Sequence, residues 1–104
     1  MSRNLMVVFT NTQPGKDDDF NRWYDDIHVG EVLSVPEMKA CTRYKVVDEN
    51  AEHRYLALYE FEGDPDAVMA SMGERAAQFD MTGPLGGAPL MLRVEPISER
   101  VESE

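Results

Sequence analysis

Cysteine is scarce in this sequence: Cys41 is the only one in 104 residues, so no disulfide can form within one chain. Small secreted domains usually depend on several disulfides, whereas a lone thiol is typical of a reducing compartment. Long hydrophobic runs are also absent, and the apolar part of the opening MSRNLMVVFT is too short for a signal peptide or a membrane span. We therefore expect a cytoplasmic protein without membrane contact, in which Cys41 is a buried thiol with no special role.

Basic residues are few, with ten Lys and Arg against twenty Asp and Glu and a net charge of -10. Such a chain repels phosphate backbones, so we expect no nucleic-acid partner. A hydrophobic content of 42% suffices for a core without disulfides, and no linker or short repeat divides the chain. We expect a single domain over residues 1–104, with frayed ends at 1–3 and 98–104.

Histidine occurs only at His28 and His53, and neither has Cys or His neighbours at the spacing of metal ligands. No serine lies in a nucleophile elbow, and the stretch TGPLGGAP lacks the strand-to-helix context and the lysine of a phosphate loop. We expect no metal and no cofactor. We interpret His53, beside a hairpin turn, as a surface residue.

The stretch DDDFNRWYDDIHVGEVLSVP, residues 17–36, concentrates large side chains on one helical face. They recur at the i, i+3, i+4, i+7, i+8 spacing, at Phe20, Trp23, Tyr24, Ile27 and His28. This pattern predicts a helix from Asp18 to Val29, with Asp17 as its cap, Gly30 as its terminator and a loose turn before Pro36.

Two interpretations of this face remain open. Trp23, Tyr24 and His28 each combine an apolar body with a polar tip that needs a partner once buried. Tyr24 and His28, one turn apart, can face a pocket lined by Phe20, Trp23 and Ile27. Alternatively, the aromatic residues belong to the core and His28 is a core or rim histidine with satisfied hydrogen bonds.

The remaining elements alternate in a recognisable order. Strands are predicted over Asn4–Asn11, Glu37–Val47, His53–Glu62 and Leu90–Pro96. A second helix, capped by Asp64, is predicted to run to about Phe79, followed by an irregular, partly mobile loop over Thr82–Pro89. The order β-α-β-β-α-β predicts a ferredoxin-like α+β sandwich, in which two helices cover one face of a four-stranded antiparallel sheet.

The first and third predicted strands are apolar on both faces, although two helices cover only one. A second copy of the chain, packed sheet to sheet about a two-fold axis, would cover the other face and form a dimeric α+β barrel. We therefore expect a homodimer. The alternative is a monomer whose second face is covered by residues 82–89 and the C-terminal tail.

The order of elements and the stretch FNRWYDDIHVGEVLSVPEM resemble the dimeric α+β barrel superfamily, and Trp23-Tyr24 followed by His28 is similar to its EthD-like branch. Gly30 stands where that branch often has proline. The superfamily includes monooxygenases, polyketide cyclases, muconolactone isomerases and haem-degrading enzymes. The resemblance implies a ligand cleft between helices and sheet, lined by Phe20, Trp23, Tyr24 and His28. The haem-degrading members use a histidine on the second helix, and the second predicted helix here has none, so the resemblance disfavours haem as a substrate.

The strand residues that join the cleft depend on register, because an error of one residue exchanges the two faces. Phe9 and Asn11 are candidates, with Val8 and Thr10 as the alternative pair. Tyr55, Leu58 and Tyr59 come from the third strand, and Phe79 from the second helix. As substrate-binding residues we select Phe20, Trp23, Ile27, Phe9, Asn11, Tyr59 and Phe79.

Our first hypothesis is a cofactor-independent enzyme that acts on a small apolar, aromatic or polyketide-like carbonyl compound. His28 is the general acid or base and Tyr24 the hydrogen-bond donor, for cyclase, isomerase, lyase or monooxygenase-like chemistry. Asp25 either fixes the His28 tautomer or is a solvated surface residue, and Arg43 and Arg93 either bind a carboxylate or lie at the dimer seam. The alternative function is a non-catalytic ligand-binding or accessory protein of a catabolic or biosynthetic pathway.

Overall fold

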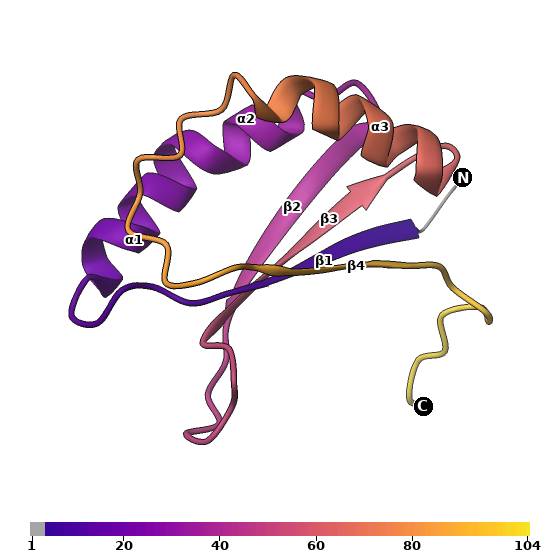
Figure 1. Ribbon diagram of the computed structural model, residues 1–104. Helices are drawn as coiled ribbons and strands as arrows, with labels where there is room; N and C mark the ends of the chain where they lie inside the picture. Colours follow the sequence, from indigo (N-terminus) through magenta and orange to yellow (C-terminus); the bar gives the residue numbers. More distant parts are fainter. Residues whose placement is uncertain (1–3) are drawn as a thin grey trace.

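The computed structural model describes residues 4–104, so the predicted frayed end at 1–3 lies outside the described residues. The elements follow one another as β1 (Asn4–Thr10), α1 (Asp17–Trp23), η1 (Tyr24–His28), α2 (Val29–Leu33), β2 (Met38–Lys45), β3 (Tyr55–Phe61), α3 (Pro65–Ala76) and β4 (Leu90–Val94). The four strands form an antiparallel sheet in the order β2-β3-β1-β4. All helices lie over one face of this sheet (Figure 1). The predicted ferredoxin-like α+β fold is confirmed.

The first helical region is continuous from α1 through η1 to α2, and so extends past the predicted end at Val29 to Leu33. Gly30 continues the helix and does not terminate it. The predicted cap is also wrong, because Lys16 precedes the helix and makes no side-chain capping bond. Asp17 instead accepts a hydrogen bond of 2.5 Å from the Tyr55 hydroxyl, which ties the first turn of the helix to β3.

The residue pairing of the sheet determines which side chains face the helices. Met6, Val8 and Thr10 of β1 pair with Tyr59, Ala57 and Tyr55 of β3, and all of them are buried beneath the helices. Between Met38 and Ala40 the pairing of β2 shifts by one residue, as at a β-bulge. Met38 therefore shares the helix-facing side with Cys41 and Arg43, rather than with Ala40 and Thr42 as simple alternation predicts. The Cys41 thiol is partly buried, not fully buried as predicted.

The core lies between the helices and the sheet. Its least exposed large side chains come from every layer: Tyr24, Tyr59, Phe20, Phe61, Val35 and Val68. α3 contributes Val68 and Met72, and its N-terminus has the predicted cap, since the Asp64 carboxylate accepts from the Ala67 N–H. α3 ends at Ala76, three residues before the predicted end.

The opposite side of the sheet, here called the outer face, presents apolar residues from all four strands. Their alternation and pairing assign to it Leu5, Val7, Phe9, Tyr44, Leu56, Leu58, Leu90, Leu92 and Val94. Tyr44 is 50% exposed and Leu92 46% exposed. The C-terminal tail does not cover this face, since Ile97 is 98% exposed. The face is therefore open among the described residues of a single chain.

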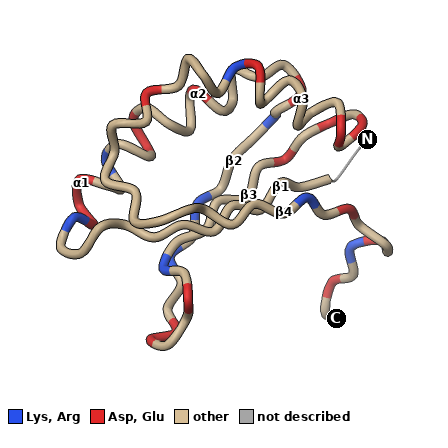
Figure 2. The backbone as a smooth tube through the Cα atoms, viewed as in Figure 1, with Lys and Arg blue, Asp and Glu red and all other residues tan. Residues whose placement is uncertain are grey.

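Charged residues lie along the helices, the β2–β3 connection and the C-terminal segment (Figure 2). Figure 1 shows that the β2–β3 connection and the C-terminal segment project from the sheet on the side away from the helices. No helix among residues 4–104 has both the length and the apolar character needed to cross a membrane.

Candidate functional site

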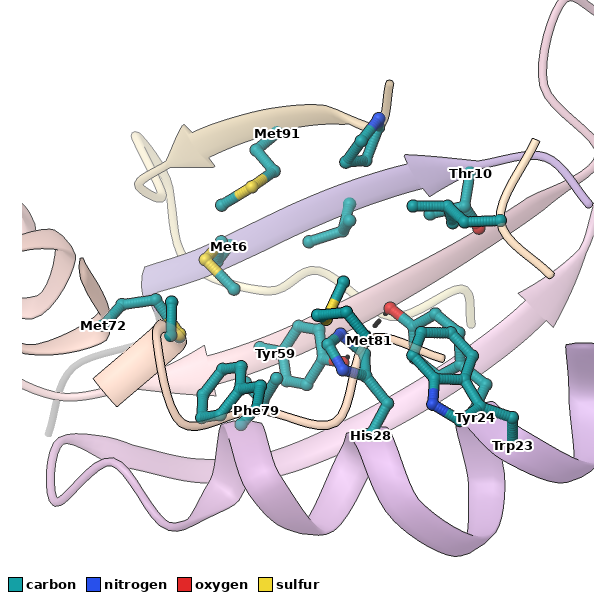
Figure 3. Close-up of a pocket in the computed structure, with 15 residues that line it drawn as sticks. Met6, Thr10, Trp23, Tyr24, His28, Tyr59, Met72, Phe79, Met81 and Met91 are labelled. Atoms are coloured by element: carbon teal, nitrogen blue, oxygen red, sulfur yellow. Dashed lines mark hydrogen bonds between the residues drawn. The ribbon is translucent and has the colours of Figure 1, made fainter. Parts of the chain in front are cut away.

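A cavity of about 240 Å³ lies between the helices and the helix-facing side of the sheet. Its walls come from β1, the first helical region, β3, α3, the segment that follows α3 and β4, and Figure 3 shows the side chains around it. The lining residues are Met6, Val8, Thr10, Trp23, Tyr24, His28, Val32, Tyr59, Met72, Ala76, Phe79, Met81, Leu85, Pro89 and Met91. The polar tips among them are few, and no lining residue is Asp, Glu, Lys or Arg.

The π-helical turn η1 determines how the aromatic residues meet at this cavity. In a π turn the backbone hydrogen bond joins residues i and i+5, as the Val29 N–H and the Tyr24 carbonyl do here. This wider turn brings residues five apart closer to the same side of the helix than an α turn does. Trp23 and His28 stack with ring centroids 4.8 Å apart, while Tyr24 meets His28 edge-on at 4.9 Å.

Two polar groups at the cavity have hydrogen-bonding capacity that the described residues do not use. The Tyr59 hydroxyl donates to the Tyr24 oxygen at 3.2 Å, which leaves the Tyr24 hydrogen without an acceptor among the hydrogen bonds of the described residues. His28 Nδ1 is buried and has no hydrogen-bond partner within the described chain. A buried polar atom without a partner is costly, so such an atom at a cavity indicates a place for a ligand or an ordered water.

Burial determines the charge states of both groups. It lowers the pKa of His28 below its ordinary value of 6.5, a shift that the Glu31 carboxylate opposes and the Arg43 cation reinforces. Burial also raises the pKa of Tyr24, against the hydrogen bond from Tyr59 and the nearby Arg43. Near neutral pH the site therefore contains a neutral imidazole that can accept a proton and a protonated phenol that can donate a hydrogen bond.

The segment 78–89, here called the roof, closes the cavity with Phe79, Met81, Leu85 and Pro89. Both polar groups of the Asp80 backbone form hydrogen bonds with side chains of the first helical region. Trp23 Nε1 donates to the Asp80 carbonyl at 2.9 Å, and the Asp80 N–H donates to Glu31 Oε2 at 2.7 Å. Trp23 thus contacts both His28 and the roof.

The C-terminal half of the roof forms backbone hydrogen bonds with the segment after β1. The Gln13 N–H donates to the Pro84 carbonyl at 2.9 Å, and the Gly86 N–H donates to the Asn11 carbonyl at 2.8 Å. The roof is irregular, as the sequence predicts. The glycines and prolines of this segment predict irregular backbone, but they do not predict the hydrogen bonds that hold the roof over the cavity.

Gly83 of the roof packs directly against the ring of Trp23. A methyl group at position 83 would lie 2.0 Å from Trp23 Cδ2. We expect Gly83→Ala to displace the roof or the indole, weaken the Trp23–Asp80 hydrogen bond and cost about 1–3 kcal/mol of stability. Thermal unfolding and the emission of Trp23, the only tryptophan, measure this effect.

Gly73 in α3 supplies the matched control, because a methyl group there would meet nothing within 4 Å. Gly73→Ala should leave the tryptophan emission unchanged and raise stability by up to about 1 kcal/mol, since alanine favours a helix over glycine. Unchanged emission and stability in Gly83→Ala would show that the roof does not pack against Trp23 in solution.

The structure brings five of the predicted site residues together at the cavity: Trp23, Tyr24, His28, Tyr59 and Phe79. Phe20 lies behind them with 0% exposure, and its ring packs against Tyr24 at 5.6 Å and Tyr55 at 5.3 Å. Phe20 is therefore a core residue, not a wall of the cavity.

Three other predicted site residues lie elsewhere. Ile27 is 38% exposed and lines a shallow depression outside the cavity. Phe9 is on the outer face, 5.8 Å from the His53 ring, because the alternative pair Val8 and Thr10 faces the helices. Asn11 accepts from the Arg54 N–H and donates to the Glu52 carbonyl, so it fixes the base of the β2–β3 connection.

Four methionines of the cavity were not predicted as site residues: Met6, Met72, Met81 and Met91. A methionine in a strand or helix pattern indicates burial and nothing more specific. Their unbranched thioethers adapt to irregular ligands and make favourable contacts with aromatic rings. The signal that could have found Met6 was its two-residue spacing from Val8 and Thr10.

The two arginines with open roles do not line the cavity. Arg43 binds Asp25 Oδ1 at 2.7 Å, so Asp25 is paired with Arg43 at the helix surface. Arg93 binds Asp66 Oδ1 at 2.7 Å on the outside of α3. Within residues 4–104, no three His, Cys, Asp or Glu side chains gather in a way that could hold a metal ion.

A helix-covered cavity on a four-stranded antiparallel sheet of this topology is an arrangement of the ferredoxin-like α+β fold. No protein-family model matches the sequence. No curated protein matches it either. Solved structures of this fold do match it, an EthD-family protein among them, which confirms the resemblance at the level of fold.

Three of these structures illustrate the match. An EthD-family protein from Bacillus halodurans is 14% identical, with a TM-score of 0.60 and coverage of 93% of this chain and 100% of that one. The monooxygenase from the ActVA-Orf6 gene of Streptomyces coelicolor, solved in complex with the ligand Nanaomycin D, is 16% identical, with a TM-score of 0.66 and coverage of 98% and 94%. A NIPSNAP domain protein from Burkholderia xenovorans is 13% identical, with a TM-score of 0.67 and coverage of 95% and 99%.

Proposed function

We propose that this protein is a cofactor-independent enzyme that moves a proton on a small, neutral, largely aromatic or polyketide-like carbonyl compound. The observation that carries the proposal is a pair of polar groups at one apolar cavity whose hydrogen-bonding capacity the described residues do not fully use. His28 Nδ1 and the Tyr24 hydroxyl hydrogen lack partners among the described residues, and their rings are in contact. The function is the one that the aromatic helix face suggests.

The size and lining of the cavity favour this class of ligand. An apolar cavity of about 150 Å³ holds benzene in another protein, and the cavity here measures about 240 Å³. A substituted ring or a fused pair of rings is the matching size. The absence of charged lining residues, together with a net charge of -10, favours a neutral ligand over a carboxylate or phosphate.

The chemistry follows from the two charge states. Neutral His28 takes a proton from a carbon next to the carbonyl of the ligand, and the electron pair of the broken C–H bond moves to the carbonyl oxygen as an enolate. Tyr24 donates a hydrogen bond to that oxygen. Return of the proton to another carbon gives isomerisation, and attack of the enolate on a second carbonyl gives cyclisation. The fold class supports ligand binding, since the Streptomyces coelicolor monooxygenase was solved with Nanaomycin D.

The test uses β-tetralone, a neutral bicyclic ketone with acidic C–H bonds, and a naphthalene carboxylate of similar size as its charged control. We expect β-tetralone to change the Trp23 emission on binding and to exchange its acidic hydrogens faster than the buffer reaction in deuterated water, as NMR detects. The carboxylate should bind at least about tenfold more weakly, as a buried charge without a partner requires. Binding without exchange would favour the non-catalytic binding protein, and binding of neither compound would contradict both functions.

A further inference from the structure

Arg43 is the charged residue that contacts the aromatic cluster from the sheet. Its guanidinium carbon lies 4.3 Å from the centroid of the Tyr24 ring, and 5.8 and 5.9 Å from the rings of Phe20 and Tyr55. The shifted pairing near the start of β2 is what turns Arg43 toward the helices. The side chain of Arg43 is only 15% exposed, although it does not line the cavity.

The helix holds the plane of this guanidinium with two acceptors spaced one turn apart. Nη1 donates to Asp25 Oδ1 at 2.7 Å and Nη2 donates to Asn21 Oδ1 at 2.8 Å. A fork of two bonds fixes the orientation of an arginine in a way that a lysine ammonium cannot reproduce. The backbone of β2 and the two acceptors on the helix together therefore fix the position of the guanidinium relative to the Tyr24 ring.

We infer that Arg43 is a positioning residue for Tyr24, which holds the phenol ring in place and stabilises negative charge as it develops on the phenol oxygen. The inference deepens the proposed function and rests on it for the role of Tyr24. A cation over an aromatic face is attracted to the electron-rich ring, and the attraction grows as the ring gains negative charge. Because the contact is largely removed from water, it is weakly screened.

The titratable groups packed around Tyr24 place Arg43 as its only nearby cation among the groups that shift its pKa. The first helical region contributes Asp25, already paired with Arg43, and the neutral imidazole of His28, whose ring centroid lies 4.9 Å from that of Tyr24; β3 contributes the Tyr59 hydroxyl; and β2 contributes the Cys41 thiol. Burial raises the pKa of Tyr24, and the charge of Arg43 lowers it. Arg43 therefore opposes the effect of burial, from a position behind the ring.

The experiment places difluorotyrosine at position 24, which lowers the phenol pKa into a range where the protein is folded, and titrates it by fluorine NMR. Arg43→Gln should raise this pKa, and Arg43→Lys should raise it less, because lysine keeps the charge and loses the fork. Arg93→Gln is the matched control, since it removes an arginine with an equally short carboxylate contact that lies away from the aromatic rings. It should leave the pKa of residue 24 unchanged.

Exchange kinetics of β-tetralone provide the second readout. Arg43→Gln should lower kcat about tenfold with KM changed less than twofold, as expected for a largely buried cation–π contact that strengthens as charge develops. An unchanged pKa at position 24 in Arg43→Gln would overturn the inference, whatever the activity. A raised pKa in a protein without exchange activity would support the electrostatic role of Arg43 and contradict the proposed function alone.

Discussion

Replacing His28 by glutamine should lower the rate of carbon-bound hydrogen exchange by at least about 100-fold, as loss of a general base usually does. Glutamine keeps a polar side chain of similar reach and cannot take up a proton at neutral pH. His28 Nδ1 has no hydrogen-bond partner among the described residues, so the substitution breaks no bond made by that atom. Glutamine loses only the ring contacts with Trp23 and Tyr24, so stability should fall by about 1–2 kcal/mol and no more.

His53→Gln is the matched control, because His53 is the only other histidine and its ring packs against Phe9, away from the cavity. It should leave the exchange rate unchanged. The opposite pattern would contradict the proposal: a large loss of stability in His28→Gln with the exchange rate intact would make His28 a core residue.

The pH dependence of the same variant has a defined sign. Since burial lowers the pKa of His28 below 6.5, the folded imidazole stays neutral, and able to act as a base, at pH values where a free histidine is already protonated. Unfolding exposes the imidazole, so the unfolded state takes up a proton first as the pH falls below 6.5. The contribution of His28 to stability is therefore present above 6.5 and is lost as the pH falls from 6.5 to the lower pKa of the folded protein. Thermal midpoints across this interval should fall more steeply in the wild type than in His28→Gln.

The sequence predicts the aromatic face well, because the helical spacing of large polar-tipped side chains indicates one helix over most of residues 17–33. The stacking of Trp23 on His28 could not be predicted, since nothing in the residue types distinguishes a π turn from an α turn. Helical spacing pairs His28 with Tyr24, and the π turn adds Trp23. The length of the helix was underestimated because Gly30 stops a helix only when its backbone leaves the helical region.

Strand register was the main source of error in the predicted site. Both faces of β1 are apolar, so alternation alone could not choose between Phe9 with Asn11 and Val8 with Thr10. Pairing with β3 decides the matter, because Val8 lies opposite Ala57 and Thr10 opposite Tyr55, on the buried side. Arg43 was ambiguous for a related reason. The shift in pairing that turns it toward Tyr24 cannot be recognised from the alternation of polar and apolar residues along β2.

The second large effect concerns the outer face, which carries apolar residues from all four strands beside Glu60 and Thr42 and is open among the described residues. We propose that a second copy of this chain covers it and forms the homodimer that the sequence suggests. Stable interfaces bury about 800 Å² on each partner, and monomeric proteins rarely leave a large contiguous apolar patch in water. Because folding of each chain would then depend on its partner, the thermal midpoint should rise with protein concentration.

Leu92 tests this assembly, because it is 46% exposed in the single chain and lies on the outer face opposite Val7. In a monomer, Leu92→Asp would cost little, since a half-exposed position tolerates a charge. In a dimer it buries an unpaired carboxylate twice, once from each chain, at several kcal/mol in all. We expect Leu92→Asp to be monomeric or unfolded in sedimentation experiments at micromolar concentration, where the wild type sediments as a dimer. Ile27→Asp is the matched control, since Ile27 is 38% exposed on the helical side, and it should remain dimeric. A wild type that sediments as a folded monomer, with a midpoint independent of concentration, would contradict the dimer.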